Sequence, residues 1–411
     1  MSAEGFALFA ARVAADGALA ARLRPIGEAG ALAGAAATEA RALGFDVAVA
    51  DVEAAMHNNR AGWLMHPSPL LAYPVPPGDG TAVAWVPQRG NLLDGWTPIR
   101  AAPLGDGLAV DWCHLGGRRF TAPFFFETIS LGIGHPFNAA FHQRRPADEL
   151  AALSPGLPPS GFVFHTARCG STLVAQALAA DSAHVVISEP LPVRNVLQAW
   201  ASPAAAPARA DGWLKGIVDA LGRPRFPGES RYFVKFMAAD VLDLDRITRL
   251  YPDVPWVFLK RDPLDILGSQ MRCGGADTIP GAVSPERLGL GPDEAWSMPA
   301  EHYQLYALAA YARAALDALA RPGSRGLVLD YRDLPDALWG RIPAHFGFDP
   351  GPAGVAAMRG VAGRHAKAPG TPFTPDGAAK RALAAPWRDA AERIAGRAFA
   401  ALDAARRGGT P

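Results

Sequence analysis

Residues 161–176 read GFVFHTARCGSTLVAQ, and this stretch decides the predicted fold of the larger part of the chain. A short apolar run, Phe162–Phe164, is followed by a polar turn at residues 168–172 and then by an Ala- and Leu-rich helical pattern. The first N–H groups of a helix have no intrahelical partner, and the helix dipole favours negative charge there. The stretch therefore predicts a strand, a turn and a helix N-terminus that bind a phosphate.

The side chains of this turn agree with an anion site. Gly170 allows the backbone to approach a phosphate closely, Arg168 adds a positive charge, and Ser171 and Thr172 add hydroxyls. The turn lacks the Gly-Lys-Ser/Thr ending of a nucleotide triphosphatase loop, and no lysine is placed for a β- or γ-phosphate. Ordinary ATP or GTP chemistry is therefore disfavoured.

From Gly161 to about Pro350 the pattern alternates between strands and helices. The predicted strands are Phe162–His165, Val185–Ile187, Tyr232–Lys235, Trp256–Lys260 and Gly326–Leu329. The predicted helices are Thr172–Ala180, Leu191–Ala199, Val241–Leu250, Asp265–Arg272 and Glu301–Leu319. Short, fully apolar strands between helices are typical of a parallel sheet covered on both faces. We predict a three-layer α/β fold with its ligand site at the carboxyl ends of the strands.

The first 150 residues differ in character. Residues 1–60 show helical spacing and predict a small helical unit, with Thr38 as a helix N-cap. Residues 61–150 predict a β-rich unit, and a Pro-rich boundary at 146–160 leads to the α/β domain at 157–411. The predicted β fragments are Ala82–Val86, Leu108–Trp112, Phe120 and Phe124–Phe126. His66, Asp79, His114 and His135 lack the spacing of a metal-oxygenase triad, so scattered core and surface histidines are favoured and no metal site is predicted.

Composition excludes several classes of protein. The 411 residues are long for one domain, and 40 basic against 39 acidic residues give a net charge of +1. That balance argues against nucleic acid or an anionic membrane as a partner. Three cysteines far apart suit a reducing cytosol and not a disulfide scaffold. No signal-peptide core or membrane-spanning run is found, so a soluble cytoplasmic protein is expected, of open oligomeric state.

A second motif follows another predicted strand. Residues 257–272 read VFLKRDPLDILGSQMR, an apolar strand followed by Arg-Asp-Pro, with Ser269 eight residues after Arg261. Together, HTARCGSTLVAQAL and this motif resemble sulfotransferases, above all the branch with Arg-Ser-Gly-Thr-Thr that includes tyrosylprotein sulfotransferases. Cys169 stands where that family has a small serine. The resemblance covers roughly residues 160–350, and for Arg261 alone a surface ion pair with Asp262 or Asp265 is the simpler explanation.

The resemblance implies a donor, 3′-phosphoadenosine 5′-phosphosulfate, with adenosine 3′,5′-bisphosphate as product and no required metal. The residues it implies for the 5′-phosphosulfate are Arg168, Cys169, Gly170, Ser171 and Thr172. Those it implies for the 3′-phosphate are Arg261 and Ser269, with help from Arg272 one helical turn further on. The acceptor is expected to be a small molecule or a peptide, and the family does not identify it.

Two more residues lie at the ends of predicted strands, Glu189 just after one and Lys235 as the last residue of another. Glu189, in VVISEP, lies as far after Arg168 as the catalytic glutamate of the tyrosylprotein branch lies after its loop arginine, which implies a general base. A glutamate that stabilises the N-terminus of the next helix explains the same position, and the two interpretations are compatible. Lys235, in YFVKFMAAD, resembles the lysine that steadies the bridging oxygen, a role that Arg168 could share. Catalysis is therefore predicted to use Glu189, Lys235 and Arg168.

Other features keep more than one explanation. His365, Lys367 and Lys380 lie in a segment that either closes over the nucleotide or forms a solvated basic tail. The Cys169 thiol either has a lowered pKa at the helix N-terminus or simply fills space. Residues 6–23 and 39–56 weakly resemble the leader-like helices of nitrile-hydratase-type precursor peptides, although an ordinary helical bundle explains them. A kinase-like phosphotransferase and a non-catalytic nucleotide- or peptide-binding protein remain alternatives to the sulfotransferase.

Overall fold

The computed structural model describes residues 3–64, 95–153, 155–200, 207–275, 279–372 and 377–408. These residues form two compact units. The first unit takes residues from 1–119, 125–156 and 191–225, and the second from 120–124, 157–190 and 226–411. The domain boundaries expected from the sequence stay predictions, since each unit joins separate stretches of the chain.

The second unit is built on a five-stranded sheet in which every neighbouring pair is parallel. Its strands, in the order they occur in the sheet, are β5 (His184–Ser188), β6 (Arg231–Lys235), β4 (Pro159–His165), β7 (Trp256–Lys260) and β8 (Gly326–Asp330). The predicted α/β fold with a parallel sheet is confirmed. All five predicted strands are present, and each has the length of an ordinary strand, five to seven residues.

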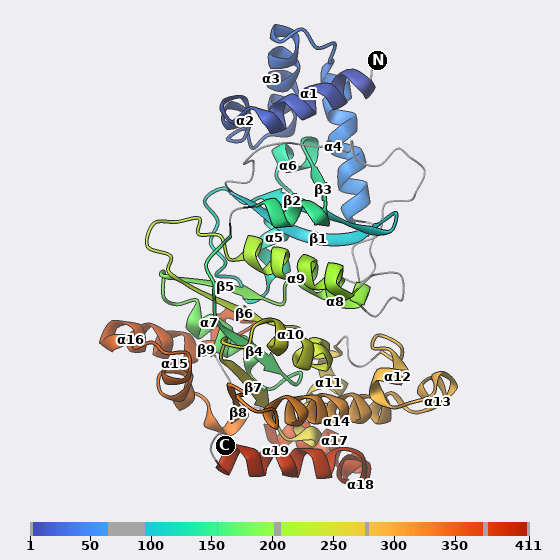
Figure 1. Ribbon diagram of the computed structural model, residues 1–411, viewed down its shortest axis with the longest axis vertical. Helices are drawn as coiled ribbons and strands as arrows, with labels where there is room; N and C mark the ends of the chain where they lie inside the picture. The colour runs from blue at the N-terminus through green and yellow to red at the C-terminus, as the bar shows by residue number, and fades with distance from the viewer. Residues whose placement is uncertain are drawn as a thin grey trace. The chain divides into compact units, whose positions relative to one another are not determined.

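Helices flank this sheet (Figure 1). The helices of this unit are α7 (Ser171–Leu178), α10 (Leu244–Leu250), α11 (Pro263–Cys273), α12 (Pro285–Leu288), α13 (Pro292–Ser297), α14 (Ala300–Leu319), α15 (Arg341–His345), α16 (Gly351–Ala362), α17 (Gly377–Ala384), α18 (Arg388–Ala391) and α19 (Arg397–Gly408), of which α12 and α13 lie away from the sheet. A two-stranded hairpin, β9 (Arg364–His365) and β10 (Ala368–Pro372), lies between α16 and α17. The helix predicted at Val241–Leu250 begins as a 3₁₀ turn at Ala238–Asp243, and α10 follows it.

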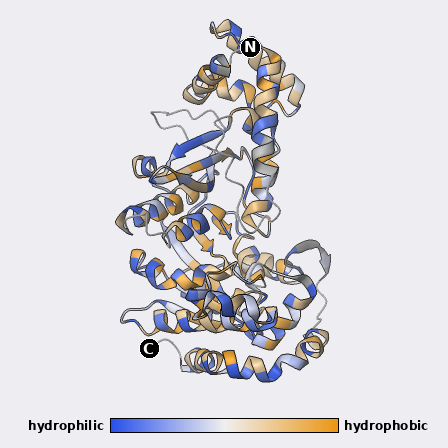
Figure 2. Ribbon diagram, turned by 90° about the vertical axis from the view of Figure 1, so that its right-hand side faces the viewer, coloured by the Kyte–Doolittle hydropathy of each residue, from blue (hydrophilic) through white to orange (hydrophobic). Residues whose placement is uncertain are grey.

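Both faces of the sheet are buried, as alternate residues of the central strand show. Val163 packs into one core with α7 and α16, whereas Phe162 and Phe164 point to the opposite face. There Phe164 stacks on Phe236, with ring centres 4.5 Å apart. Figure 2 shows hydrophobic and hydrophilic residues interleaved along the helices, as expected for helices with one buried side.

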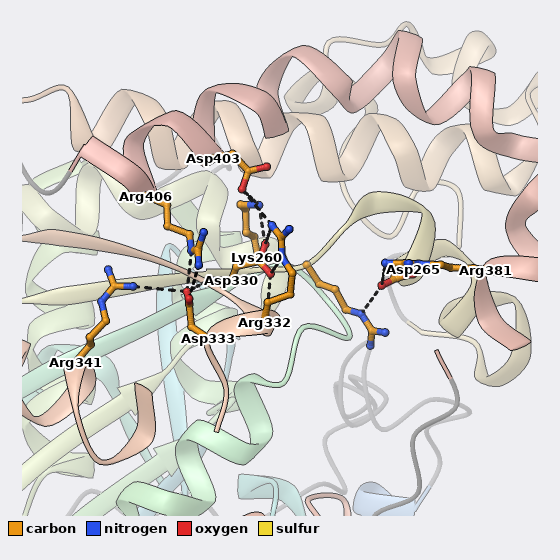
Figure 3. Close-up of polar contacts among 10 residues, drawn as sticks. Lys260, Asp265, Asp330, Arg332, Asp333, Arg341, Arg381, Asp403 and Arg406 are labelled. Carbon is orange, nitrogen blue, oxygen red and sulfur yellow. Dashed lines mark hydrogen bonds and ion pairs between the residues drawn. The ribbon is translucent and has the colours of Figure 1, made fainter. Parts of the chain in front are cut away.

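The C-terminal helix α19 is bound to the edge of the sheet by ion pairs (Figure 3). Lys260, the last residue of β7, lies 2.8 Å from Asp330 of β8 and 2.7 Å from Asp403 of α19. Burial acts to raise the pKa of Asp330, but Arg332 and Lys260 outweigh it and hold the pKa well below its usual range. A further ion pair joins Arg406 of α19 to Asp333, which lies shortly after the end of β8.

The first unit begins with helices and continues with a small antiparallel sheet. The helices are α1 (Ala3–Ala15), α2 (Gly17–Leu23), α3 (Ala29–Ala42) and α4 (Val49–Leu64), and the sheet has the order β1 (Trp96–Leu104), β2 (Gly107–His114), β3 (Gln143–Pro146). Four further helices, α5 (Phe125–Ile133), α6 (Pro136–Ala140), α8 (Leu191–Trp200) and α9 (Pro207–Leu221), belong to the same unit. The predicted helical and β-rich character of the N-terminal part is confirmed.

Two local predictions in this part are wrong. Thr38 is no N-cap: it lies inside α3, where its hydroxyl donates to the carbonyl of Gly34, and Glu28 caps the helix instead. The Phe-rich run is no strand, since Phe125 opens the helix α5. The predicted strand Ala82–Val86 and the residues His66 and Asp79 lie outside the described residues. Within the described part of the chain, no helix has the length and apolar character needed to cross a bilayer.

Candidate active site

The turn between β4 and α7 has the geometry of an anion cradle. Gly170 is the N-cap residue of α7, with φ of 90°, and no side chain caps the helix there. The N–H of Ser171 contacts the Cys169 sulfur, and the N–H of Thr172, the next in the first turn of α7, remains available to a ligand. Ser171 and Thr172, in the first turn, are each about one-twentieth exposed (5%). The structure thus keeps the predicted turn residues together at the helix N-terminus.

Gly170 is needed for steric reasons as well. A Cβ atom there would lie 2.8 Å from Leu334 Cδ1, and the positive φ is costly for any other residue. We expect Gly170→Ala to lower the free energy of unfolding by about 2 kcal/mol or more, measured by urea denaturation. Gly360→Ala, in α16 with nothing within 4 Å, is the matched control and should be neutral or slightly stabilising. Equal losses in the two variants would contradict the steric argument.

Arg168 and Glu189 share an unusual backbone conformation. With φ of 57° and 61°, they are the non-glycine residues of the described chain that have positive φ. Such conformations cost free energy and persist only where the surrounding structure enforces them, commonly at functional sites. Each follows a strand of the sheet, Arg168 after β4 and Glu189 directly after β5. Two of the three predicted catalytic residues therefore lie at strained positions.

A hydrogen bond joins the two predicted motifs. Arg168 Nε donates to Ser269 Oγ at 2.8 Å, although the residues are 101 positions apart in the sequence. Ser269 is buried in α11, which follows β7, the strand next to β4. The cradle and the Arg261/Ser269 motif are consequently neighbours at the carboxyl edge of the sheet.

Arg261 lies in a dense group of contacts. Its Nε donates to Asp265 Oδ2 at 3.2 Å, and its guanidinium stacks 4.3 Å from the centre of the Tyr331 ring. Arg381 of α17 contacts the same carboxylate, with Nε 2.5 Å from Asp265 Oδ1. Two guanidinium groups thus converge on one aspartate, and Figure 3 shows the Asp265–Arg381 pair. Arg272, by contrast, is exposed.

Glu189, Lys235 and His165 form the second part of the site. Lys235, the last residue of β6, is fully buried and donates from Nζ to Glu189 Oε1. His165 Nε2 lies 3.7 Å from the same oxygen and 3.0 Å from the carbonyl oxygen of Phe236. Both side-chain contacts of Glu189 use Oε1, and within the described part of the chain Oε2 makes no hydrogen bond.

The charges around Glu189 decide its protonation. Burial acts to raise its pKa, but the ammonium of Lys235 outweighs burial, and the pKa lies below its usual value. The carboxylate is therefore ionised at neutral pH. Burial, and then the charge of Lys235, lower the pKa of His165 to about 4, so that its imidazole is neutral.

The ring of Phe124 contacts two lysines close to the Glu189–Lys235 pair. The Phe124 ring centre lies 5.5 Å from Lys235 Nζ and 5.4 Å from Lys367 Nζ, within the range of cation–π contacts. Lys367, on the β9–β10 hairpin, is exposed, as is His365. Of the basic residues considered in the C-terminal segment, Lys367 lies near Glu189, whereas the backbone carbonyl of Lys380 packs against Gly268 of α11.

Cys169 is a space-filling residue. It is fully buried in the core beside α7, and burial raises the pKa of its thiol to about 11. The alternative of a thiol with a lowered pKa at the helix N-terminus is wrong, because burial outweighs the hydrogen bonds that favour the thiolate.

Sequence reasoning missed three residues of this site: Phe124, Tyr331 and Arg381. The ion pair of Arg261 with Asp265 was one of the two expected from the sequence, and it is present, although both residues are buried and do not lie on the surface. Phe124 and Arg381 carried no usable signal, because they come from distant parts of the chain. Among the described residues, no group of three or more metal-ligating side chains is found.

Comparisons with known proteins give a limited result. No protein-family model matches the chain, and no curated protein matches it. Among solved structures, it is similar to sulfotransferase STF9 from Mycobacterium avium, with 14% identity over 59% of this chain and 78% of that chain and a TM-score of 0.37. It is also similar to the sulfotransferase domain of the Synechococcus PCC 7002 olefin synthase, with 17% identity, 60% and 96% coverage and a TM-score of 0.34. A third similar structure is a sulfotransferase from Alicyclobacillus acidocaldarius, with 18% identity over 60% of this chain and 99% of that chain and a TM-score of 0.34. Values this low assign no function.

Proposed function

We propose that the second unit is a sulfotransferase that moves a sulfuryl group from 3′-phosphoadenosine 5′-phosphosulfate to a hydroxyl or amine. The observation that carries the proposal is the hydrogen bond from Arg168 to Ser269. This hydrogen bond places the two motifs next to each other, and a donor with two separated anionic groups would need both. A protein that held a single phosphate would need only the cradle.

The residues present fit such a donor. The uncapped N-terminus of α7, with Arg168, Ser171 and Thr172, would hold the 5′-phosphosulfate. Arg261 and Ser269 would hold the 3′-phosphate, with Arg261 kept in position by stacking on Tyr331. Cys169 would contribute small volume only, and Arg272 would add charge from an exposed position. When bound, the donor supplies the sulfuryl group.

Glu189 is proposed as the general base. Its carboxylate is ionised, Oε1 is held by Lys235, and Oε2 is left to accept the proton of the acceptor. Lys235 and Arg168 would neutralise the charge that develops on the departing phosphate. In the free protein the ammonium of Lys235 is paired with Glu189, so an incoming anion would compete for it and leave the base less strongly held.

The identity of the ligand is tested by thermal stabilisation of the full chain. Adenosine 3′,5′-bisphosphate is expected to raise the melting temperature by mass action, with about 2.7 kcal/mol of stabilisation at 100 times its Kd. ATP with Mg²⁺ should have a smaller effect, because the turn has no lysine for a β- or γ-phosphate. A larger effect of ATP with Mg²⁺ would favour a phosphotransferase and refute the proposal.

The 3′-phosphate assignment makes a separate prediction. Arg261→Ala is expected to weaken binding of adenosine 3′,5′-bisphosphate about ten- to a hundredfold, while adenosine 5′-phosphate binds nearly as before. The fold should tolerate the change, since Asp265 keeps its contact with Arg381. Arg272→Ala, a neighbouring but exposed arginine, is the control and should have a smaller effect. Calorimetric titration measures both; equal losses for the two nucleotides would refute the assignment.

A further inference from the structure

A cavity lies at the amino ends of the strands of the sheet, whereas the candidate active site lies at their carboxyl ends. Its volume is about 440 Å³, within the range of small-molecule pockets. It is lined by Ser160, Ser230, Arg231, Pro255, Arg325, His345, Phe346 and Gly347. The first five of these residues stand at or near the starts of strands β4, β6, β7 and β8, and the last three lie at the C-terminal end of α15, whereas the candidate active site follows the strand ends. The seven residues of β4 span about 20 Å, so the two places are distinct.

The charge of this cavity is one-sided. Its lining includes two arginines and no aspartate or glutamate. Among the residues that the structure describes, neither Arg231 nor Arg325 forms an ion pair, and Arg231 only stacks on Phe348, 5.3 Å from the ring centre. In the same unit, Arg287 and Arg321 each contact an aspartate. Two guanidinium groups facing one cavity without a carboxylate create a positive potential inside it.

The remaining lining residues define what kind of anion fits. Ser160 and Ser230 bring hydroxyls, and Pro255 and Phe346 bring apolar surface. His345 Nε2 lies 3.1 Å from the carbonyl oxygens of both Trp256 and Arg325, so it donates to the backbone and shapes the wall. Burial lowers the pKa of His345, so its imidazole adds no charge at neutral pH. The same contacts fix the main chain that carries the Arg325 side chain.

We propose that this cavity binds a small tetrahedral oxyanion, a phosphate or sulfate group, either free or carried as an ester. The planar guanidinium groups of Arg231 and Arg325 would pair with its oxygens, because this fork geometry suits such anions. The hydroxyls of Ser160 and Ser230 would satisfy further oxygens, and the carbon part of an ester would pack on Phe346 and Pro255. The site is independent of the proposed sulfuryl transfer.

The test is calorimetric titration of the full chain with inorganic phosphate, inorganic sulfate and phenyl phosphate, at matched ionic strength. Arg231→Gln and Arg325→Gln should each weaken binding of the best probe at least about tenfold. The protein should still fold with Arg325→Gln, since the Arg325 side chain is exposed and His345 contacts the backbone carbonyl of Arg325, which the substitution keeps. Arg313→Gln, an exposed arginine of α14, is the matched control and should change the affinity less than about twofold.

A second comparison separates this site from the cradle at α7. Arg168→Ala removes anion binding at the cradle and should leave in place the binding that Arg231→Gln and Arg325→Gln weaken, because Arg168 follows the end of β4 whereas Arg231 and Arg325 stand at the starts of β6 and β8. Tighter binding of phenyl phosphate than of inorganic phosphate would identify an ester as the ligand, and equal binding would identify the free anion; both support the site. The proposal is overturned if no probe binds at about 10 mM. It is equally overturned if Arg168→Ala abolishes binding while the Gln variants retain it.

Discussion

Replacing Glu189 with glutamine is expected to lower the rate of sulfuryl transfer about 10²- to 10⁴-fold. The amide keeps the shape of the side chain and still accepts a hydrogen bond from Lys235, but it cannot take a proton. Glutamine is preferable to alanine, because alanine would leave the fully buried ammonium of Lys235 without its partner. The measurement is the formation of adenosine 3′,5′-bisphosphate from the donor, with phenol, alcohol and amine acceptors.

Unlike the transfer rate, the affinity for adenosine 3′,5′-bisphosphate should not fall in Glu189→Gln. Removal of the negative charge of Glu189 leaves the positive charges of Lys235 and Arg168 less compensated, so the bisphosphate is expected to bind as tightly as before or somewhat more tightly. Glu294→Gln, an exposed carboxylate of α13, controls for the substitution and should leave both rate and affinity unchanged. Full turnover by Glu189→Gln would show that another group acts as the base.

The sheet could be predicted from the sequence because each of its strands is a short apolar run that can be recognised without knowledge of the rest of the fold. Trp256–Lys260 was predicted with the bounds that the structure has, since Pro255 precedes the apolar run Trp256–Leu259 and Lys260 ends it. The polar strand Gln143–Pro146 could not be predicted this way. Its Arg144 pairs with the buried Asp111 of β2, at 2.6 Å, so a charged residue occupies a position that a sequence pattern assigns to the surface. Helix Pro207–Leu221 was missed because it follows a Pro- and Ala-rich stretch.

The candidate site divides in the same way. Arg168, Glu189, Lys235 and Arg261 could be found because each ends or follows a predicted strand, and the carboxyl ends of parallel strands lie on the same side of a sheet. The contact of Arg381 with Asp265 spans 116 positions and depends on how α17 packs against α11. Gly268 permits that packing: a Cβ atom there would lie 2.1 Å from the carbonyl oxygen of Lys380. Such contacts follow from the assembled fold, and no local pattern encodes them.

Replacing Lys235 with methionine is expected to lower the transfer rate and also to move its pH dependence. The ammonium of Lys235 is the main charge that lowers the pKa of Glu189 against the effect of burial. Without it, burial prevails and the pKa of Glu189 rises. A base must be deprotonated to act, so the acidic limb of the pH–rate profile should shift to higher pH. Loss of charge neutralisation at the departing phosphate should lower the maximal rate by about 10²-fold or more.

Lys260→Met separates this effect from the general cost of removing a buried lysine. Lys260 also ends a strand of the sheet and pairs with two carboxylates, but it lies outside the proposed catalytic group. Asp330 and Asp403 both keep a contact with Arg332, so the fold should survive with lower stability. The acidic limb should then stay where it is in the unaltered protein. A shift of the limb in Lys260→Met and none in Lys235→Met would mean that the titrating group is not Glu189, because Lys235 alone of the two lysines contacts that carboxylate.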